Sequence, residues 1–270
     1  MRRCLIAGCG DVGTRLGLRL AAAGVEVHAL TRRSVPPEPL RGHHVDLTSP
    51  QSSWPRHPEF DSLVYLPAPA RRDEASYRGL YIDGPARLLD ALPTAPRRIL
   101  FVSSTAVYGE DDGGWVDEDT PPQPRTWNGQ ILLEAEQRLR ERIPGLIVVR
   151  FAGLYGPGRE ALLSRVRAGR AGATGHWTNR IHVDDAAAAL HHVLDLAAPA
   201  SVYLGADGHP AAEAAVMQWL ASRLGLAAVE PTAGPPSGRR IGAARLAASG
   251  FAWAWPDYRA GYGGLLPPAA

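Results

Sequence analysis

This sequence has few cysteines, no large excess of positive or negative charge, and no long apolar run. Its two cysteines, Cys4 and Cys9, lie close together near the N-terminus, so no disulfide can join distant segments, and reduced thiols in a cytoplasmic protein fit this usage. The 29 basic and 27 acidic residues give a net charge of +2 without a dense basic tract, which argues against nucleic acid as a partner. No stretch approaches the roughly 20 apolar residues that span a bilayer, which argues against membrane insertion.

The first thirty-odd residues are the most informative stretch. Residues 3–7 form a short apolar run that stops at a G-x-G-x-x-G turn, residues 14–23 have helical periodicity, and residues 25–30 alternate like a strand. In such a βαβ unit the glycines permit a tight turn, and a pyrophosphate lies on the helix N-terminus. We therefore predict dinucleotide binding by Gly8, Gly10, Asp11, Val12 and Gly13.

The end of the second strand indicates which dinucleotide is bound. An acidic side chain there would accept from the ribose 2′-hydroxyl of NAD, whereas arginine would pair with the 2′-phosphate of NADP. This chain has Thr31, Arg32 and Arg33 at that point and no carboxylate. The sequence favours NADP(H), with NAD(H) possible. Alternatively, both arginines are ordinary solvated turn residues.

Two further strand ends are candidates for the same cofactor site. Residues 43–47 have the pattern of a short strand ending in an acid, which can face the adenine or simply begin a turn. Residues 60–66 have that of a buried strand, followed by small residues that leave room for a pyrophosphate and ribose. The candidates at these ends are Asp46, Leu47, Pro67 and Ala68.

Later motifs resemble one known family. Residues 98–102 predict another strand, which runs into the sequence SSTAVYG at residues 103–109. With RFAGLYGPG at 150–158 and RIHVDD at 180–185, this segment resembles the NAD-dependent epimerase/dehydratase family, also called the extended short-chain dehydrogenase/reductases. The resemblance extends over nearly the whole chain.

The resemblance implies an α/β fold, a Rossmann-type doubly wound, mainly parallel sheet with a small C-terminal substrate lobe. Residues 1–150 would form the NAD(P)-binding core. Residues 151–270 would form the lobe, interleaved with the end of the core in a single structural domain. The family's habit also implies a small-molecule substrate and a possible homodimer.

The family's catalytic pair is missing from this sequence. In the family, a Tyr and a Lys four residues later work with a Ser or Thr beside the nicotinamide, and Ser104 matches that Ser/Thr position. Asn128 and Leu132 match the tyrosine and lysine positions, and a shift by one residue gives Trp127 and Ile131 instead. None of these side chains titrates, so the usual proton relay cannot run from them.

Other residues could serve the site in place of the missing pair. By the same resemblance, Ser103 would lie beside the cofactor, and Tyr108 is a structural residue of the V-Y-G turn or a substitute acid. Asn128 could hold a carbonyl or a water by hydrogen bonds. Glu134 and Glu136 are predicted to lie on a solvated, charged helix face. No set of residues has the spacing of metal ligands.

Three functions remain open from the sequence. The chain is an NADP(H)-dependent reductase, epimerase or dehydratase acting on a small carbonyl or sugar-like substrate. Alternatively, it is a catalytically inactive NADP(H)-binding regulatory or scaffold protein. A third possibility is a structural oligomer with a vestigial cofactor site.

Overall fold

The structure, a computed structural model, divides into two compact units that alternate along the chain. It describes residues 2–33, 35–50, 59–169, 174–230 and 234–266. Unit 1 consists of Met1–Val107, Pro124–Arg150 and Ala187–Tyr203, and unit 2 of Tyr108–Gln123, Phe151–Ala186 and Leu204–Ala270. In the part of the chain that is described, none of the helices combines the length and apolarity needed to cross a membrane.

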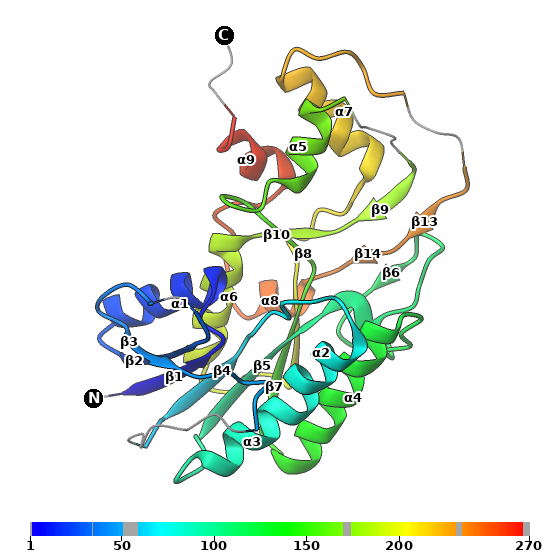
Figure 1. Cartoon of the computed structure of the whole chain (residues 1–270). Helices are drawn as coiled ribbons and strands as arrows, with labels where there is room; N and C mark the ends of the chain where they lie inside the picture. Colours follow the sequence, from blue (N-terminus) through cyan, green and yellow to red (C-terminus); the bar gives the residue numbers. More distant parts are fainter. Residues whose placement is uncertain (1, 34, 51–58, 170–173, 231–233, 267–270) are drawn as a thin grey trace. The chain divides into compact units, whose positions relative to one another are not determined.

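The main sheet, most of which belongs to unit 1, has seven strands in the order β11-β7-β5-β4-β1-β2-β3 (Figure 1). Its strands are β1 Arg3–Ala7, β2 Glu26–Thr31, β3 Arg41–His44, β4 Ser62–Tyr65, β5 Arg98–Ser104, β7 Ile147–Phe151 and β11 Val202–Gly205. β1 pairs in parallel with both β2 and β4. The strand order reverses between β1 and β4, and ligands of doubly wound sheets bind outside the carboxyl ends of the strands at such a switch point. The predicted fold class is confirmed.

Helices flank this sheet. Helix α1 Asp11–Ala22 lies on one face, and α2 Glu74–Arg78, α3 Gly84–Ala91 and α4 Trp127–Arg142 gather on the other (Figure 1). A π-helical turn, η1 Gly79–Asp83, joins α2 to α3. A Cβ at Gly84 would lie 2.5 Å from the Tyr65 hydroxyl and 3.0 Å from the Leu47 carbonyl oxygen. The glycine therefore lets α3 pack closely on the end of β4.

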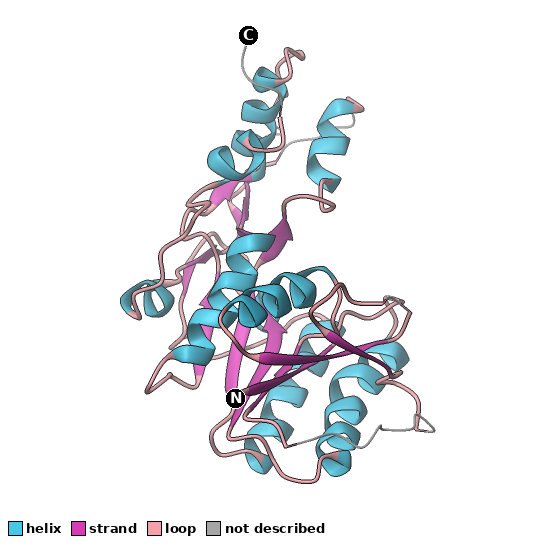
Figure 2. Ribbon diagram, turned by 90° about the vertical axis from the view of Figure 1, so that its left-hand side faces the viewer, coloured by secondary structure: helices cyan, strands magenta, loops and turns pink. Residues whose placement is uncertain are grey.

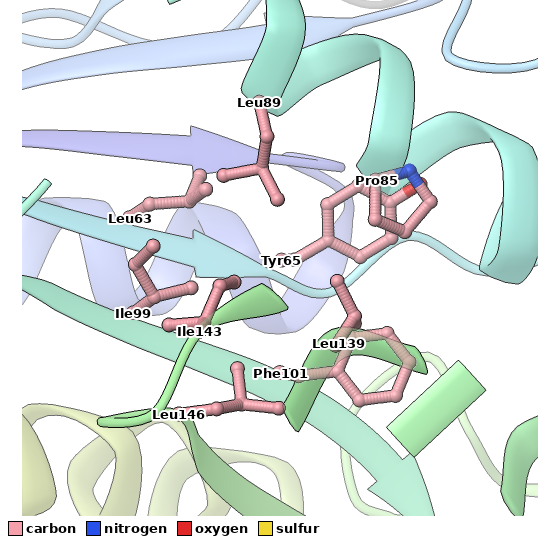
Figure 3. Close-up of a pocket in the computed structure, with 9 residues that line it drawn as sticks. All are labelled: Leu63, Tyr65, Pro85, Leu89, Ile99, Phe101, Leu139, Ile143 and Leu146. Carbon is pink, nitrogen blue, oxygen red and sulfur yellow. The ribbon is translucent and has the colours of Figure 1, made fainter. Parts of the chain in front are cut away.

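An apolar gap lies between this layer of helices and the sheet (Figure 3). It is lined by Leu63, Tyr65, Pro85, Leu89, Ile99, Phe101, Leu139, Ile143 and Leu146. The only polar side-chain atom among them, the Tyr65 hydroxyl, donates to the Leu80 carbonyl. Without a free polar group to orient a ligand, this gap belongs to the core of unit 1.

The predicted solvated face of α4 is wrong for Glu136. This carboxylate is completely buried and pairs with Arg150 of β7, which is itself buried. Arg150 Nε lies 3.0 Å from Oε1 and Nη2 lies 2.6 Å from Oε2, a bidentate ion pair. Glu134 does lie at the surface, where it pairs with Arg78 and Arg138. The two acids of one helix therefore have opposite environments.

Unit 2 combines small sheets with helices (Figure 2). Its strands are β6 Trp115–Val116, β8 Gly153–Tyr155, β9 His176–Thr178, β10 Arg180–His182, β12 Ala211–Ala212, β13 Ser237–Gly238 and β14 Arg240–Ile241. Its helices are α5 Ala161–Arg167, α7 Glu213–Arg223, α8 Ala244–Ala248 and α9 Tyr258–Gly263, and α6 Val183–Asp195 begins in this unit. Leu163 and Val166 of α5 pack with Val216, Met217 and Leu220 of α7 to form its core.

A buried pair of charged residues also lies within unit 2. Arg180 and Asp207 are both more than nine-tenths buried, and the backbone N–H of Asp207 donates to the Arg180 carbonyl at 2.8 Å. Burial raises the pKa of Asp207 to about 7, against the opposing effects of a hydrogen bond from His209 and the charge of Arg180. Both side chains are closed to solvent, so they belong to the interior of the unit.

Candidate functional site

The glycine turn after β1 has the geometry that a pyrophosphate-binding turn requires. Gly8 has φ +97°, and a Cβ there would overlap the Cα of Pro67 at the end of β4. The backbone N–H groups of Gly8 and Cys9 donate to the Leu30 carbonyl at 3.2 and 3.0 Å. The turn is therefore held between the ends of β2 and β4, at the switch point of the sheet.

The other two glycines of the motif have different roles. A Cβ at Gly13 would lie 2.9 Å from the Gly8 carbonyl oxygen, so this glycine permits α1 to approach the turn. Within the described part of the chain, no atom lies within 4 Å of the Cβ position of Gly10, and no side chain caps the N-terminus of α1 there. The Asp11 carboxylate instead lies 2.8 Å from Arg15 Nε on the same helix. Since an uncapped helix N-terminus favours an anion, these residues fit a bound phosphate.

The end of β2 has no acidic side chain at the surface. Thr31 is buried, Arg32 is half-buried and Arg33 is exposed. Burial raises the pKa of Asp46, but hydrogen bonds from Thr48 and the charges of Arg32 and Arg87 outweigh it, so this pKa lies below its ordinary value. Arg32 therefore lies close enough to Asp46 for the two charges to interact.

The segment after β3 differs from its prediction. The strand predicted at residues 43–47 is wrong in its bounds, because β3 Arg41–His44 ends earlier. Asp46 accepts from the backbone N–H of Thr48 at 2.9 Å and from its hydroxyl at 2.7 Å, which turns the chain out of the sheet. This geometry favours the turn interpretation of Asp46. An adenine contact of Asp46 or Leu47 stays a prediction.

Supporting residues around Leu47 and Pro67 could not be recognised from the sequence. Leu47 is buried, and its carbonyl accepts from Arg87 Nη2 at 2.8 Å. The Pro67 carbonyl accepts from the Tyr81 hydroxyl at 3.2 Å, and Ala68 is exposed. Neither Arg87 nor Tyr81 has a sequence signal for this role, because each is a single polar residue on a helix.

Two adjacent serines close strand β5. Ser103 is buried, and its Oγ has no hydrogen-bond partner among the residues that the structure describes. Ser104 is half-buried, and its Oγ accepts from the backbone N–H of Ala106 at 3.2 Å, in the 3-10 turn η2 Thr105–Val107. A serine Oγ that accepts one hydrogen bond still has its own hydrogen to donate.

Asn128 lies in the first turn of α4, which packs on the segment directly after Ser104. Asn128 is half-buried, and a Cβ at its neighbour Gly129 would overlap the Ala106 carbonyl oxygen. The structure therefore brings the segments of Ser104 and Asn128 together within unit 1. Leu132, which the sequence resemblance matches to the family's lysine, is buried. That match stays a prediction.

Tyr108 has a structural contact. It belongs to unit 2, it is buried, and its hydroxyl donates to the Asp117 carbonyl at 3.1 Å. This contact favours the structural interpretation, and a role as substitute acid stays a prediction. Within the described ranges, no group of three or more His, Cys, Asp or Glu side chains is arranged to hold a metal ion.

Comparison with known proteins identifies the family. Residues 4–204 match the model of the NAD dependent epimerase/dehydratase family. The chain belongs to this family. Protein YeeZ of Escherichia coli K12 is 33% identical over 225 residues, which cover 78% of this chain and 80% of YeeZ.

Solved structures agree with this family assignment. A protein from Methylobacillus flagellatus, named for the same family, is 36% identical with a TM-score of 0.83 and covers 98% of this chain and 97% of its own. The human epimerase family protein SDR39U1, solved with NADPH, shares the fold at 23% identity and a TM-score of 0.76, covering 97% of each chain.

Proposed function

We propose that this epimerase/dehydratase family member binds NADP(H) in preference to NAD(H) at the Gly8–Gly13 turn. The observation that carries the proposal is the open face of Gly10 at the uncapped N-terminus of α1, at the switch point of the sheet. Arg32 and Arg33 follow β2 with no acidic residue in the strand end itself, and a guanidinium suits the 2′-phosphate. Asp46, whose charge interacts with Arg32, lies in the segment after β3.

The proposed reaction is a hydride transfer, epimerisation or dehydration on a small carbonyl or sugar-like substrate. The bound nicotinamide would supply or accept the hydride. Ser104 would donate its hydroxyl hydrogen to the substrate oxygen, and the Asn128 amide would hold the same group or a water. All 29 basic residues of the chain are arginines, so no lysine from elsewhere can lower the pKa of a catalytic tyrosine.

Replacing Ser104 with alanine tests the enzymatic reading. In a screen of small carbonyls and nucleotide sugars, we expect substrate-dependent NADPH oxidation. Ser104→Ala should reduce the kcat of this reaction by about 100-fold or more, because loss of one positioned hydrogen-bond donor in an active site lowers kcat by about this factor. NADPH affinity should stay unchanged. Thr105→Ala, which removes the neighbouring hydroxyl, is the control and should keep its activity. Oxidation that persists in Ser104→Ala would remove this serine from the mechanism.

The second proposal is an inactive NADP(H)-binding regulatory or scaffold protein. Leu132 and Asn128 at the positions of the catalytic pair favour it, because neither can move a proton. Tight NADPH binding without turnover of any substrate in the same screen is the result it predicts.

The setting that we propose for both functions is the cytoplasm. Cys4 and Cys9 are free thiols and both are buried. Burial raises the pKa of both thiols, that of Cys4 to about 12, so little of the reactive thiolate forms and both resist oxidation. Reduced, inert thiols suit a reducing compartment. A homodimer remains the family-based proposal for the assembly.

A further inference from the structure

Two histidines share a hydrogen bond at the edge of the sheet in unit 1. His28 of β2 is buried and His43 of β3 is half-buried. His28 Nδ1 lies 2.9 Å from His43 Nε2, with the two ring planes 8° apart, and His28 Nε2 lies 3.1 Å from Glu26 Oε1. The three side chains form a continuous chain from the carboxylate to the outer strand.

The Glu26 carboxylate decides where the hydrogens lie in the hydrogen-bonded series Glu26–His28–His43. An ionised carboxylate only accepts, so His28 Nε2 carries the hydrogen that points to Glu26. The Nδ1 atom of neutral His28 is then an acceptor, and His43 Nε2 must be the donor. His43 can take up one proton on its other nitrogen and keep this bond. Protonation of both rings puts hydrogens on both facing nitrogens, and the bond is lost.

Charged side chains surround the Glu26 carboxylate that His28 contacts. Arg3 of β1 and Arg41 of β3 both pair with the single carboxylate of Glu26, at 3.2 and 3.0 Å. From the segment before β4, Phe60 presents its ring to His28, and Asp61 accepts from the backbone N–H of Arg3. Burial first, and then the charges of His28 and Arg41, lower the pKa of His43.

The histidine pair lies directly beside the elements that position the cofactor turn. His43 is the register partner of Leu30, whose carbonyl accepts from the backbone N–H groups of Gly8 and Cys9. The Val45 N–H donates to the Thr31 carbonyl at 2.9 Å, immediately before Arg32. β3 is the last strand on this side of the sheet. Loosening β3 therefore removes support from the segment with Arg32 and Arg33.

We infer that the His28–His43 pair is a pH-sensitive switch, in which protonation of both rings breaks their hydrogen bond, loosens edge strand β3 and thereby weakens NADPH binding. This inference rests on the proposed cofactor function. The bond needs one of the two facing nitrogens to lack a hydrogen, so the folded protein disfavours protonation of both rings. The contribution of the pair is therefore present above the ordinary histidine pKa of about 6.5 and is lost as the pH falls below it.

The test is NADPH affinity, measured by calorimetry on the full chain from about pH 7.5 to about pH 5.5. The variant His43→Gln keeps an amide donor for His28 and cannot take up a proton. If His43→Gln does not fold, His43→Phe is measured in its place. His44→Gln, an exposed neighbour on the same strand, is the matched control. The 2′-phosphate itself titrates near a pKa of about 6, but equally in every variant.

We expect wild type and His44→Gln to lose about tenfold more affinity over this range than His43→Gln. As the pH is lowered over this range, the midpoint of thermal unfolding should likewise fall less in His43→Gln than in wild type. Parallel curves for His43→Gln and wild type would overturn the switch alone. Absence of NADPH binding by wild type at every pH would overturn the proposed cofactor function and the switch with it.

Discussion

Glu136→Ala is expected to lower the free energy of unfolding by about 3–5 kcal/mol, the cost of breaking a buried ion pair by removing one partner. Arg150 would remain with its guanidinium inside the core of unit 1 and without the carboxylate that binds both Nε and Nη2. Arg140, the other partner of Glu136, is a weaker contact at 3.4 Å and is half-exposed. Urea unfolding followed by circular dichroism measures the effect.

The control lies two residues earlier on the same helix. Glu134→Ala removes surface ion pairs with Arg78 and Arg138 and should cost less than about 1 kcal/mol. Equal losses in the two variants would mean that the Glu136 carboxylate is not held by Arg150 inside the protein.

Gly10→Ala is expected to reduce NADPH affinity by at least about tenfold, or about 1.4 kcal/mol, while the chain stays folded. Among the residues that the structure describes, no neighbouring atom lies within 4 Å of the added methyl group, so folding is not opposed. It would occupy the space through which a pyrophosphate approaches the backbone and the N-terminus of α1. Calorimetric titration with NADPH, together with a thermal melt, separates binding from stability.

Gly24→Ala is the matched control for glycine replacement at the other end of α1. Gly24 also faces open space, and its φ of +78° makes alanine strained, at a cost of about 1–3 kcal/mol. This variant should lose stability and keep its NADPH affinity. If Gly10→Ala instead binds NADPH like wild type, the turn is not the site of the pyrophosphate.

The sheet and its glycine turn could be predicted from the sequence because their signals are local. The apolar run before Gly8 and the helical periodicity after Gly13 lie next to each other in the chain, and the structure has β1 and α1 there. Short strands of unit 2 such as β12 and β13, of two residues each, pair across long stretches of chain and leave no periodic pattern.

Burial of polar side chains was the main feature that the sequence could not reveal. A carboxylate on an amphipathic helix is normally solvated, and only the position of Arg150 in β7 makes Glu136 an interior residue. The link between His28 and His43 likewise depends on the register of β2 and β3. At the candidate site, the family resemblance placed Ser104 and Asn128, but only the close approach of Gly129 to Ala106 shows that their segments meet.

The most direct test of the central proposal is a calorimetric titration of the purified protein with NADPH and with NADH, repeated on the double variant Arg32→Ala/Arg33→Ala. We predict that wild type binds NADPH at least about tenfold more tightly than NADH, and that the double variant loses this difference while keeping its NADH affinity. Binding of neither nucleotide by the folded wild-type protein would contradict the account, and the enzymatic reading would fall with it.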